Sequence, residues 1–159
     1  MSFEASSFRD KAVVWLATGF YTGNIPWAPG TFGTLPGLFL CFFLARLPLL
    51  VSILLILALI ALAIWIAGEA EKMLGKKDPG CIVIDEIAGM AVTLLAIPIS
   101  LQTAVAGFLL FRFFDVVKPP PIRTIDKKVH GGIGIVMDDV IAGVFANLVL
   151  RAGIYLMNS

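Results

Sequence analysis

The stretch LLVSILLILALIALAIWIAG, residues 49–68, contains twenty consecutive residues without a charge. A helix rises about 1.5 Å per residue, so this segment reaches about 30 Å, the hydrocarbon thickness of a bilayer. The whole chain suits that environment, because 59% of its 159 residues are hydrophobic and only 14% are charged. Soluble domains carry roughly 45–50% apolar and about 25% charged residues. The sequence therefore predicts an integral membrane protein of the all-α class.

Shorter apolar runs on both sides of this segment extend the prediction to a polytopic helical bundle. The expected membrane helices are about five in number, over residues 33–46, 49–69, 85–98, 101–116 and 138–157, with a further interfacial helix over 11–20. Arg151 lies near the end of the last span, where a long side chain can reach the membrane surface. Without a repeat or a low-complexity linker, residues 1–159 are expected to form a single domain, and residues 1–11 lack the pattern of a cleaved signal peptide.

Charged residues divide unequally between the two faces of this predicted bundle. Ten of the twelve Lys and Arg residues fall on one side of the membrane, and only Arg46 and Arg151 fall on the other. Such a bias predicts that the first side is cytoplasmic. All eleven acids lie on or near the same side. One end of the bundle is thus polar and the other nearly inert, which indicates a functional site at the cytoplasmic face.

Five carboxylates at that face are the strongest candidates for chemistry. Asp85-Glu86 and Asp138-Asp139 precede apolar helices, and Asp115 closes the helix expected over 101–116. A single acid at a helix start is commonly a cap, and that reading stays open for each pair. Capping needs only one carboxylate per helix, however, and several at one membrane depth repel one another unless a cation lies between them. Oxygen ligands of this kind suit Mg²⁺.

Other polar residues near the same face are typical of phosphate chemistry. Lys118 and Arg123 lie on either side of three consecutive prolines, which impose a stiff, non-helical path, and Arg112 lies further upstream near the end of the helix expected over 101–116. They are candidate phosphate ligands, or alternatively they bind anionic lipid headgroups nonspecifically. His130, the only histidine, is a candidate proton donor to a leaving alcohol. Glu69, at the end of the second predicted span, is a further candidate metal ligand.

The sequence also excludes several functions. A net charge of +1 gives no reason to expect a nucleic-acid partner. Cys41 precedes Arg46 by one residue too few for a cysteine-phosphatase loop, and Cys81 has no partner arginine. No D-x-D motif offers an aspartyl-phosphate nucleophile. Water activated by a metal ion is the remaining simple route to phosphate hydrolysis.

Four stretches of the chain match the motifs of a known family in their order and spacing. They are GNIPWAPGTFGT at 23–34, IVIDEIAGM at 82–90, FRFFDVVKPPPIR at 111–123 and HGGIGIVMDDVIAG at 130–143. Through them the chain resembles phosphatidylglycerophosphatase A, a bacterial enzyme that converts phosphatidylglycerophosphate to phosphatidylglycerol. The matched motifs span most of the chain, so the resemblance is specific.

The resemblance implies a Mg²⁺-dependent phosphatase in the bacterial cytoplasmic membrane, with phosphatidylglycerophosphate as substrate and membrane lipids as surroundings. The matching metal and catalytic candidates are Asp85, Glu86, Asp115, Asp138 and Asp139. The matching positions that we expect to handle phosphate or a proton are Thr31, Lys118, Arg123 and His130. The alternative is a carboxylate-lined cation transporter, which predicts acids through the full membrane depth rather than at one end. Oligomeric state is not predicted.

Overall fold

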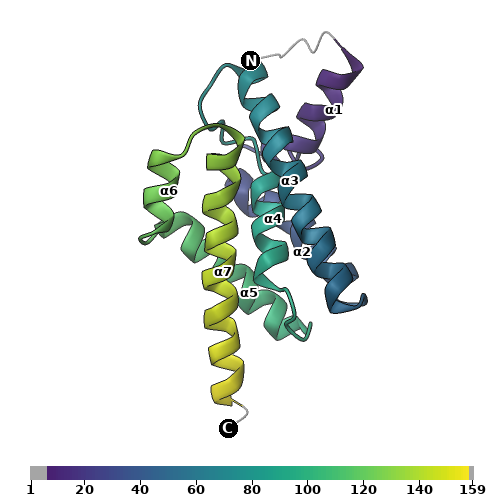
Figure 1. The fold of residues 1–159 in the computed structure, drawn as a ribbon, viewed down its shortest axis with the longest axis vertical. Coiled ribbons are helices and arrows are strands. Elements are labelled where there is room, and N and C mark those ends of the chain that lie inside the picture. Colours follow the sequence, from purple (N-terminus) through teal and green to yellow (C-terminus); the bar gives the residue numbers. More distant parts are fainter. Residues whose placement is uncertain (1–6, 158–159) are drawn as a thin grey trace.

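The structure, a computed structural model, describes residues 7–157, and every regular element in that range is a helix (Figure 1). Residues 1–6 and 158–159 lie outside the described range, and so does part of the segment assessed for a signal peptide. The elements are α1 (Phe8–Ala17), the short 3-10 helix η1 (Thr22–Asn24), α2 (Pro29–Leu44), α3 (Leu49–Leu74), α4 (Ile84–Thr93), α5 (Leu101–Val117), α6 (Ile122–Lys128) and α7 (Gly131–Met157). The predicted all-α class is confirmed.

Two of the described helices, α3 and α7, are long and apolar enough to cross a membrane. Only 22% of the most apolar 18-residue stretch of α3 is buried, and side chains such as Leu54 and Leu57 are each 57% exposed. A helix that is apolar on its exposed face requires apolar surroundings. The helix α2 is apolar but shorter. Length and composition thus identify two candidate spans, and the prediction of about five is not confirmed.

The helix α4 is much shorter than the predicted span over 85–98, because it ends at Thr93. Ten residues rise only about 15 Å, half of a bilayer. Carbonyl groups at the end of α4 and just beyond it, which lack helical partners, accept hydrogen bonds from α7. Asn147 Nδ2 donates to Thr93 O at 2.8 Å and to Leu95 O at 3.0 Å. Arg151 Nη2 donates to Leu95 O at 2.9 Å. Arg151 is exposed near the end of α7, and its guanidinium group binds backbone carbonyl oxygens in the turn that follows α4.

The helix α7 begins at Gly131, seven residues before the predicted start at Asp138. The glycines of the HGGIG stretch disfavour a helix, since each glycine costs about 1 kcal/mol there. Here the missing side chain is needed, because a Cβ on Gly132 would collide with the backbone carbonyl of Ile64 in α3. Close backbone approach at small residues is how membrane helices pack. The two long helices therefore cross in direct contact through Gly132.

The core centres on α4, which packs against α2, α3, α5 and α7 (Figure 1). Nearly all of its side chains are buried, from Ile84 to Thr93. Glycines bring its neighbours close: a Cβ on Gly37 of α2 would lie 2.9 Å from Ile87 Cα, and one on Gly143 of α7 would collide with the carbonyl oxygen of Gly89. Because α4 is enclosed so tightly, side chains at its first turn are held in fixed positions.

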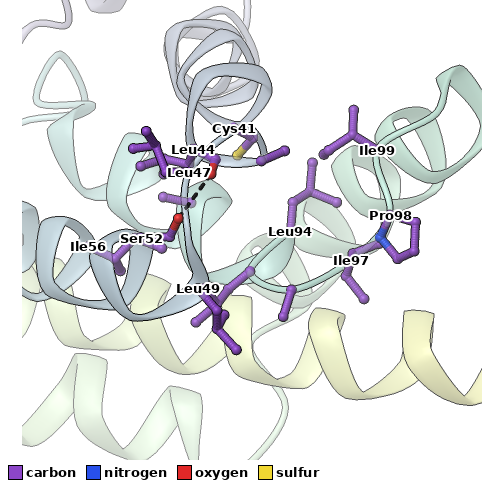
Figure 2. A pocket seen from close by; sticks show the side chains of 14 residues that line it. Cys41, Leu44, Leu47, Leu49, Ser52, Ile56, Leu94, Ile97, Pro98 and Ile99 are labelled. Carbon is purple, nitrogen blue, oxygen red and sulfur yellow. Dashed lines mark hydrogen bonds between the residues drawn. The ribbon is translucent and has the colours of Figure 1, made fainter.

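An apolar cavity of about 220 Å³ lies at the opposite end of α4, between the turn from α2 to α3 and the turn from α4 to α5 (Figure 2). Cys41, Leu94 and Pro98 are among its lining residues, and no charged residue lines it. Its hydroxyl group, Ser52 Oγ, is already used in a 2.9 Å hydrogen bond to Leu44 O. The cavity therefore has no acid to bind a metal ion and no cation to bind a phosphate, unlike the other end of α4.

Candidate active site

The first turn of α4 presents two acids to the interior. Asp85 and Glu86 follow Ile84 directly, and Val83 before them provides no side-chain cap. Both residues are buried, with 8% and 9% of their surface exposed. The amide groups and dipole of a helix N-terminus favour negative charge at this position. A dipole alone does not compensate for removing two adjacent carboxylates from water.

The second pair of acids comes from α7 and faces the first. Asp138 and Asp139 lie two turns inside that helix, so they do not cap it. They are 4% and 3% exposed. Carboxylate oxygens of Asp85, Glu86 and Asp139 lie within 4.8 Å of one another, and these three residues form the acid cluster. Unit charges about 4 Å apart repel by about 4 kcal/mol at an effective dielectric constant of 20, so these acids can all be ionised only with a compensating positive charge between them.

The hydrogen bonding of these acids is incomplete. Within the described range, Asp85 Oδ1, Glu86 Oε2 and Asp138 Oδ1 are buried without a hydrogen-bond partner. Buried polar atoms in folded proteins are nearly always satisfied, so unsatisfied oxygens gathered in one place point to a missing ligand. Mg²⁺ and other hard cations take carboxylate oxygens as ligands. The donor set of the acid cluster therefore fits a divalent cation.

Arg112 borders the cluster on the α5 side. Its Nη1 lies 2.5 Å from Asp115 Oδ2, one turn along the same helix, and 3.7 Å from Glu86 Oε1 on α4. The arginine side chain is 18% exposed, so this contact is largely shielded from water. Asp115 is therefore paired with a cation of the chain, while Glu86 shares that cation and keeps Oε2 unsatisfied.

Lys118, directly after the end of α5, contacts the second acid pair. Its Nζ lies 2.5 Å from Asp138 Oδ2 and 3.1 Å from Asp126 Oδ1 on α6. Burial acts to lower the pKa of the ammonium group, but its hydrogen bonds and charge pairing with Asp138 and Asp126 outweigh burial and raise the pKa above its ordinary value. Lys118 is thus held as a cation at the rim of the acid cluster.

The N-terminal turn of α2 covers the Arg112 side of the site. A Cβ on Gly30 would collide with Glu86 Oε1 and would lie 2.9 Å from both terminal nitrogens of Arg112. Pro29 starts this helix, a position that suits proline because the first amide has no helical partner. The motif PGT therefore places a backbone turn, with Thr31 next to it, directly against the ion pair of Glu86 and Arg112.

Three predicted site residues lie away from the acid cluster. Glu69 pairs with Arg9 at 2.8 Å and with Lys72 at 2.9 Å, and so ties α1 to α3. His130 is exposed and lines a polar cavity of about 350 Å³ on the same side of the molecule. Arg123 is exposed on α6, and among the described residues it forms no hydrogen bond or ion pair with the acids.

Asp126 is a site residue that the sequence analysis missed. It lies on α6 and lines the same polar cavity as His130, while its Oδ1 accepts a hydrogen bond from Lys118. The spacing in the sequence was a signal, because Asp126 follows the apolar Ile122 by four residues and would share its face in a helix. The proline run hid it, since nothing in the sequence showed that a helix resumes at Ile122.

Comparison with known proteins places these residues in a family. A family model described as phosphatidylglycerophosphatase A matches residues 15–154. A phosphatidylglycerophosphatase A from Escherichia coli is 40% identical over 132 residues, covering 82% of this chain and 77% of the relative. One from Haemophilus influenzae is 43% identical over 145 residues, covering 89% and 88%.

A third relative carries a different name. A protein of Bacteroides thetaiotaomicron, named as a putative phosphatidylinositol-3-phosphatase, is 38% identical over 145 residues, covering 86% of this chain and 90% of the relative. No solved structure matches the chain. The acid cluster, Arg112 and Lys118 all lie inside the residues that the family model matches.

Proposed function

This chain belongs to the phosphatidylglycerophosphatase A family and is a phosphatase, and we propose that it removes the terminal phosphate of phosphatidylglycerophosphate. The products are phosphatidylglycerol and inorganic phosphate. The observation that carries this proposal is the buried cluster of Asp85, Glu86 and Asp139 with two cations of the chain beside it, Arg112 next to Glu86 and Lys118 next to Asp138. Such a site combines oxygen ligands for a metal with donors for a phosphate.

The names of the relatives define the range of substrates to test. Two relatives carry the name phosphatidylglycerophosphatase A, as does the family model, and one is named for a phosphatidylinositol phosphate. The chemistry common to these lipids is a phosphate monoester on the headgroup of a phospholipid. Phosphatidylglycerophosphate is our first choice because the family model and two relatives carry its name.

A divalent cation, which we take to be Mg²⁺, belongs to this proposal. A phosphate monoester is an anion, and four buried carboxylates would repel it without a cation between them. Asp85, Glu86 and Asp139 would hold the ion, with Asp138 next to them. When bound, the ion would lower the pKa of a coordinated water and offset negative charge on the phosphate.

The chain's own cations have complementary tasks in this reaction. Arg112, already oriented by Asp115 and Glu86, offers planar donors of the kind that grip phosphate oxygens. Lys118, held next to Asp138, would offset charge that spreads over the phosphoryl group. The backbone at Gly30 lies close against Glu86 and Arg112 and leaves no room there for a side chain. His130 and Arg123, at the polar surface, are the candidates for proton transfer and headgroup contact.

The membrane placement that we propose is a multi-pass bundle in the cytoplasmic membrane of a bacterium. The lengths of α3 and α7 support it, and so does the gathering of Lys and Arg residues at the end of the bundle that carries the acids. The shorter helices α2, α4 and α5 would complete the bundle within the bilayer. The active site would then face the cytoplasm at the level of the lipid headgroups.

Phosphate release from defined lipids tests this function. Purified protein in detergent is given phosphatidylglycerophosphate, phosphatidic acid or phosphatidylinositol 3-phosphate, each with Mg²⁺ and with EDTA. Release from the first lipid should exceed release from the others and should stop in EDTA. Asp85→Asn and Asp138→Asn should abolish release, whereas Glu71→Gln, outside the acid cluster, should keep it.

Each contrary outcome has a separate meaning. Preference for phosphatidylinositol 3-phosphate would retain the phosphatase and replace its substrate. Release that is unchanged by EDTA and by both variants would remove the acid cluster from the chemistry. Absence of release from every lipid by folded protein would reject the proposed substrates, and ion-flux assays in proteoliposomes would then test the transporter alternative.

A further inference from the structure

Lys118 is held by two carboxylates that come from two different helices. Asp138 of α7 lies 2.5 Å from its Nζ, and Asp126 of α6 lies 3.1 Å from it. An ammonium group has three N–H donors. Two of them are used by these acids, which fix the direction of the third. A lysine bound to Asp138 alone would rotate about that single contact.

The position of Asp126 is itself well fixed. The helix α6 has only seven residues, but Ile122 at its start is fully buried in the cluster that also contains Phe111 and Ala142. Asp126 follows Ile122 by four residues, so both lie on the face of α6 that turns toward α7. The side chain of Asp126 is 33% exposed, against 6% for Asp138. Asp126 therefore remains close to solvent, outside the buried acids.

The two acids differ in what else they serve. Asp138 has a second oxygen, Oδ1, that is buried and unsatisfied beside the acid cluster, whereas Asp126 is not among the acids that gather there. If Asp138 turns toward a cation in the cluster, its hold on Lys118 weakens. Asp126 is then the acceptor that keeps the ammonium group at the rim.

We propose that Asp126 is a positioning residue of the phosphatase, which holds the Lys118 ammonium group so that its free donor faces the substrate phosphate. This inference rests on the proposed function for the identity of the substrate. It goes beyond that function by assigning a task to a residue of α6 that has no contact with the acid cluster. Asp126 acts only through Lys118, and this exclusivity is the property to test.

A double-mutant cycle measures that property. The five proteins are the wild type, Asp126→Asn, Asp126→Glu, Lys118→Met and the double variant Lys118→Met/Asp126→Asn, assayed for kcat and KM on phosphatidylglycerophosphate with Mg²⁺. We expect Asp126→Asn to lower kcat by about 10- to 100-fold, the usual cost of losing a supporting partner, with a smaller change in KM. Asp126→Glu keeps the carboxylate and should recover most of kcat. In the Lys118→Met background, Asp126→Asn should change kcat by less than about twofold.

A purely structural role would give a different pattern. Asp126→Asn would then lower kcat by the same factor with and without Lys118, and that result would overturn the proposal, as would wild-type kcat in Asp126→Asn. Glu71→Gln is the matched control, because Glu71 lines the same polar cavity without contacting Lys118, and it should keep wild-type kcat.

A second readout separates this inference from the choice of substrate. The wild type, Asp126→Asn, Lys118→Met and the double variant are unfolded by heat in EDTA, and their Tm shifts are compared. Contact between Asp126 and Lys118 predicts shifts that are not additive, whatever lipid the enzyme uses. Additive shifts would reject the pairing even if the lipid is hydrolysed. A wild type that hydrolyses none of the lipids, with non-additive shifts, would instead reject the proposed substrate and leave the pairing intact.

Discussion

Arg151 on α7 donates a hydrogen bond from Nη2 to the carbonyl oxygen of Leu95, 2.9 Å away, just beyond the end of α4. The same guanidinium group donates from Nε to Asn147 Oδ1 at 2.8 Å, and Asn147 in turn donates to Thr93 O. Lipid offers no hydrogen-bond donors, so a helix that ends inside a bilayer must have its carbonyl groups satisfied by protein. On the proposed membrane placement, these two side chains would allow α4 to end within the bilayer.

Removing this cap should destabilise the protein. Arg151→Met keeps much of the length of the side chain but leaves the carbonyl groups of Leu95 and Ala96 without this donor. We expect a loss of about 1 kcal/mol in the free energy of unfolding, the net worth of a hydrogen bond at a partly exposed site. Chemical denaturation in detergent measures it. Arg46→Met, on the exposed turn between α2 and α3, is the control and should have little effect. Equal losses in the two variants would contradict the capping role.

Metal binding should stabilise the wild type but not variants of the acid cluster. An ion that binds only the folded state adds about 2.7 kcal/mol at a concentration 100 times its Kd. Adding Mg²⁺ to EDTA-treated wild type should therefore raise its Tm, whereas Asp139→Asn should show a much smaller shift. In EDTA, Asp139→Asn should be at least as stable as the wild type, because it removes one repelling charge from the cluster. A wild-type Tm that is unchanged by Mg²⁺ would count against the metal site.

Gly30→Ala should impair catalysis out of proportion to its size. The added Cβ would meet Glu86 Oε1 and the terminal nitrogens of Arg112, so this ion pair or the first turn of α2 must shift. A displacement of such groups by about 1 Å can cost about 100-fold in rate. Phosphate release under saturating lipid measures the effect. Gly153→Ala is the control, since nothing lies within 4 Å of its Cβ position, and its activity should match the wild type.

Glu69→Gln should leave Mg²⁺-dependent activity nearly unchanged. The acid was predicted as a metal ligand, but it lies between Arg9 and Lys72, whose side chains are 61% and 77% exposed. Ion pairs this exposed contribute about 0–1 kcal/mol to stability. Activity is measured against Mg²⁺ concentration. A tenfold or greater increase in the Mg²⁺ concentration required for half-maximal activity would indicate that Glu69 is a metal ligand.

The all-helical class and the polar end of the bundle could be predicted from the sequence because they follow from runs of residue types. The uncharged stretch at 49–68 required a helix, and the acids gathered on one side of every predicted span. The start of α7 could not be predicted in this way. Whether Gly132 forms a loop or a helix depends on Ile64, a residue 68 positions earlier, whose carbonyl group leaves no room for a side chain.

The candidate site was predictable as a set of residues but not as an arrangement. The doublets at Asp85 and Asp138 were visible as charges beside apolar runs, and the structure brings their helices together. The partners of those acids were not visible. Lys118 was expected to meet phosphate, yet its distances to Asp126 and Asp138 depend on how the chain folds back through the proline run after α5.

The placement of Asp138 and Asp139 within α7, rather than in a loop beyond it, has a consequence for how the enzyme meets its substrate. On the proposed membrane placement, these carboxylates belong to a helix that diffuses in the plane of the bilayer together with the lipid. Encounter then takes place in two dimensions. The rate depends on the mole fraction of phosphorylated lipid among its neighbours, not on its amount per volume of water. Diluting the substrate with inert amphiphile at constant bulk concentration should slow turnover.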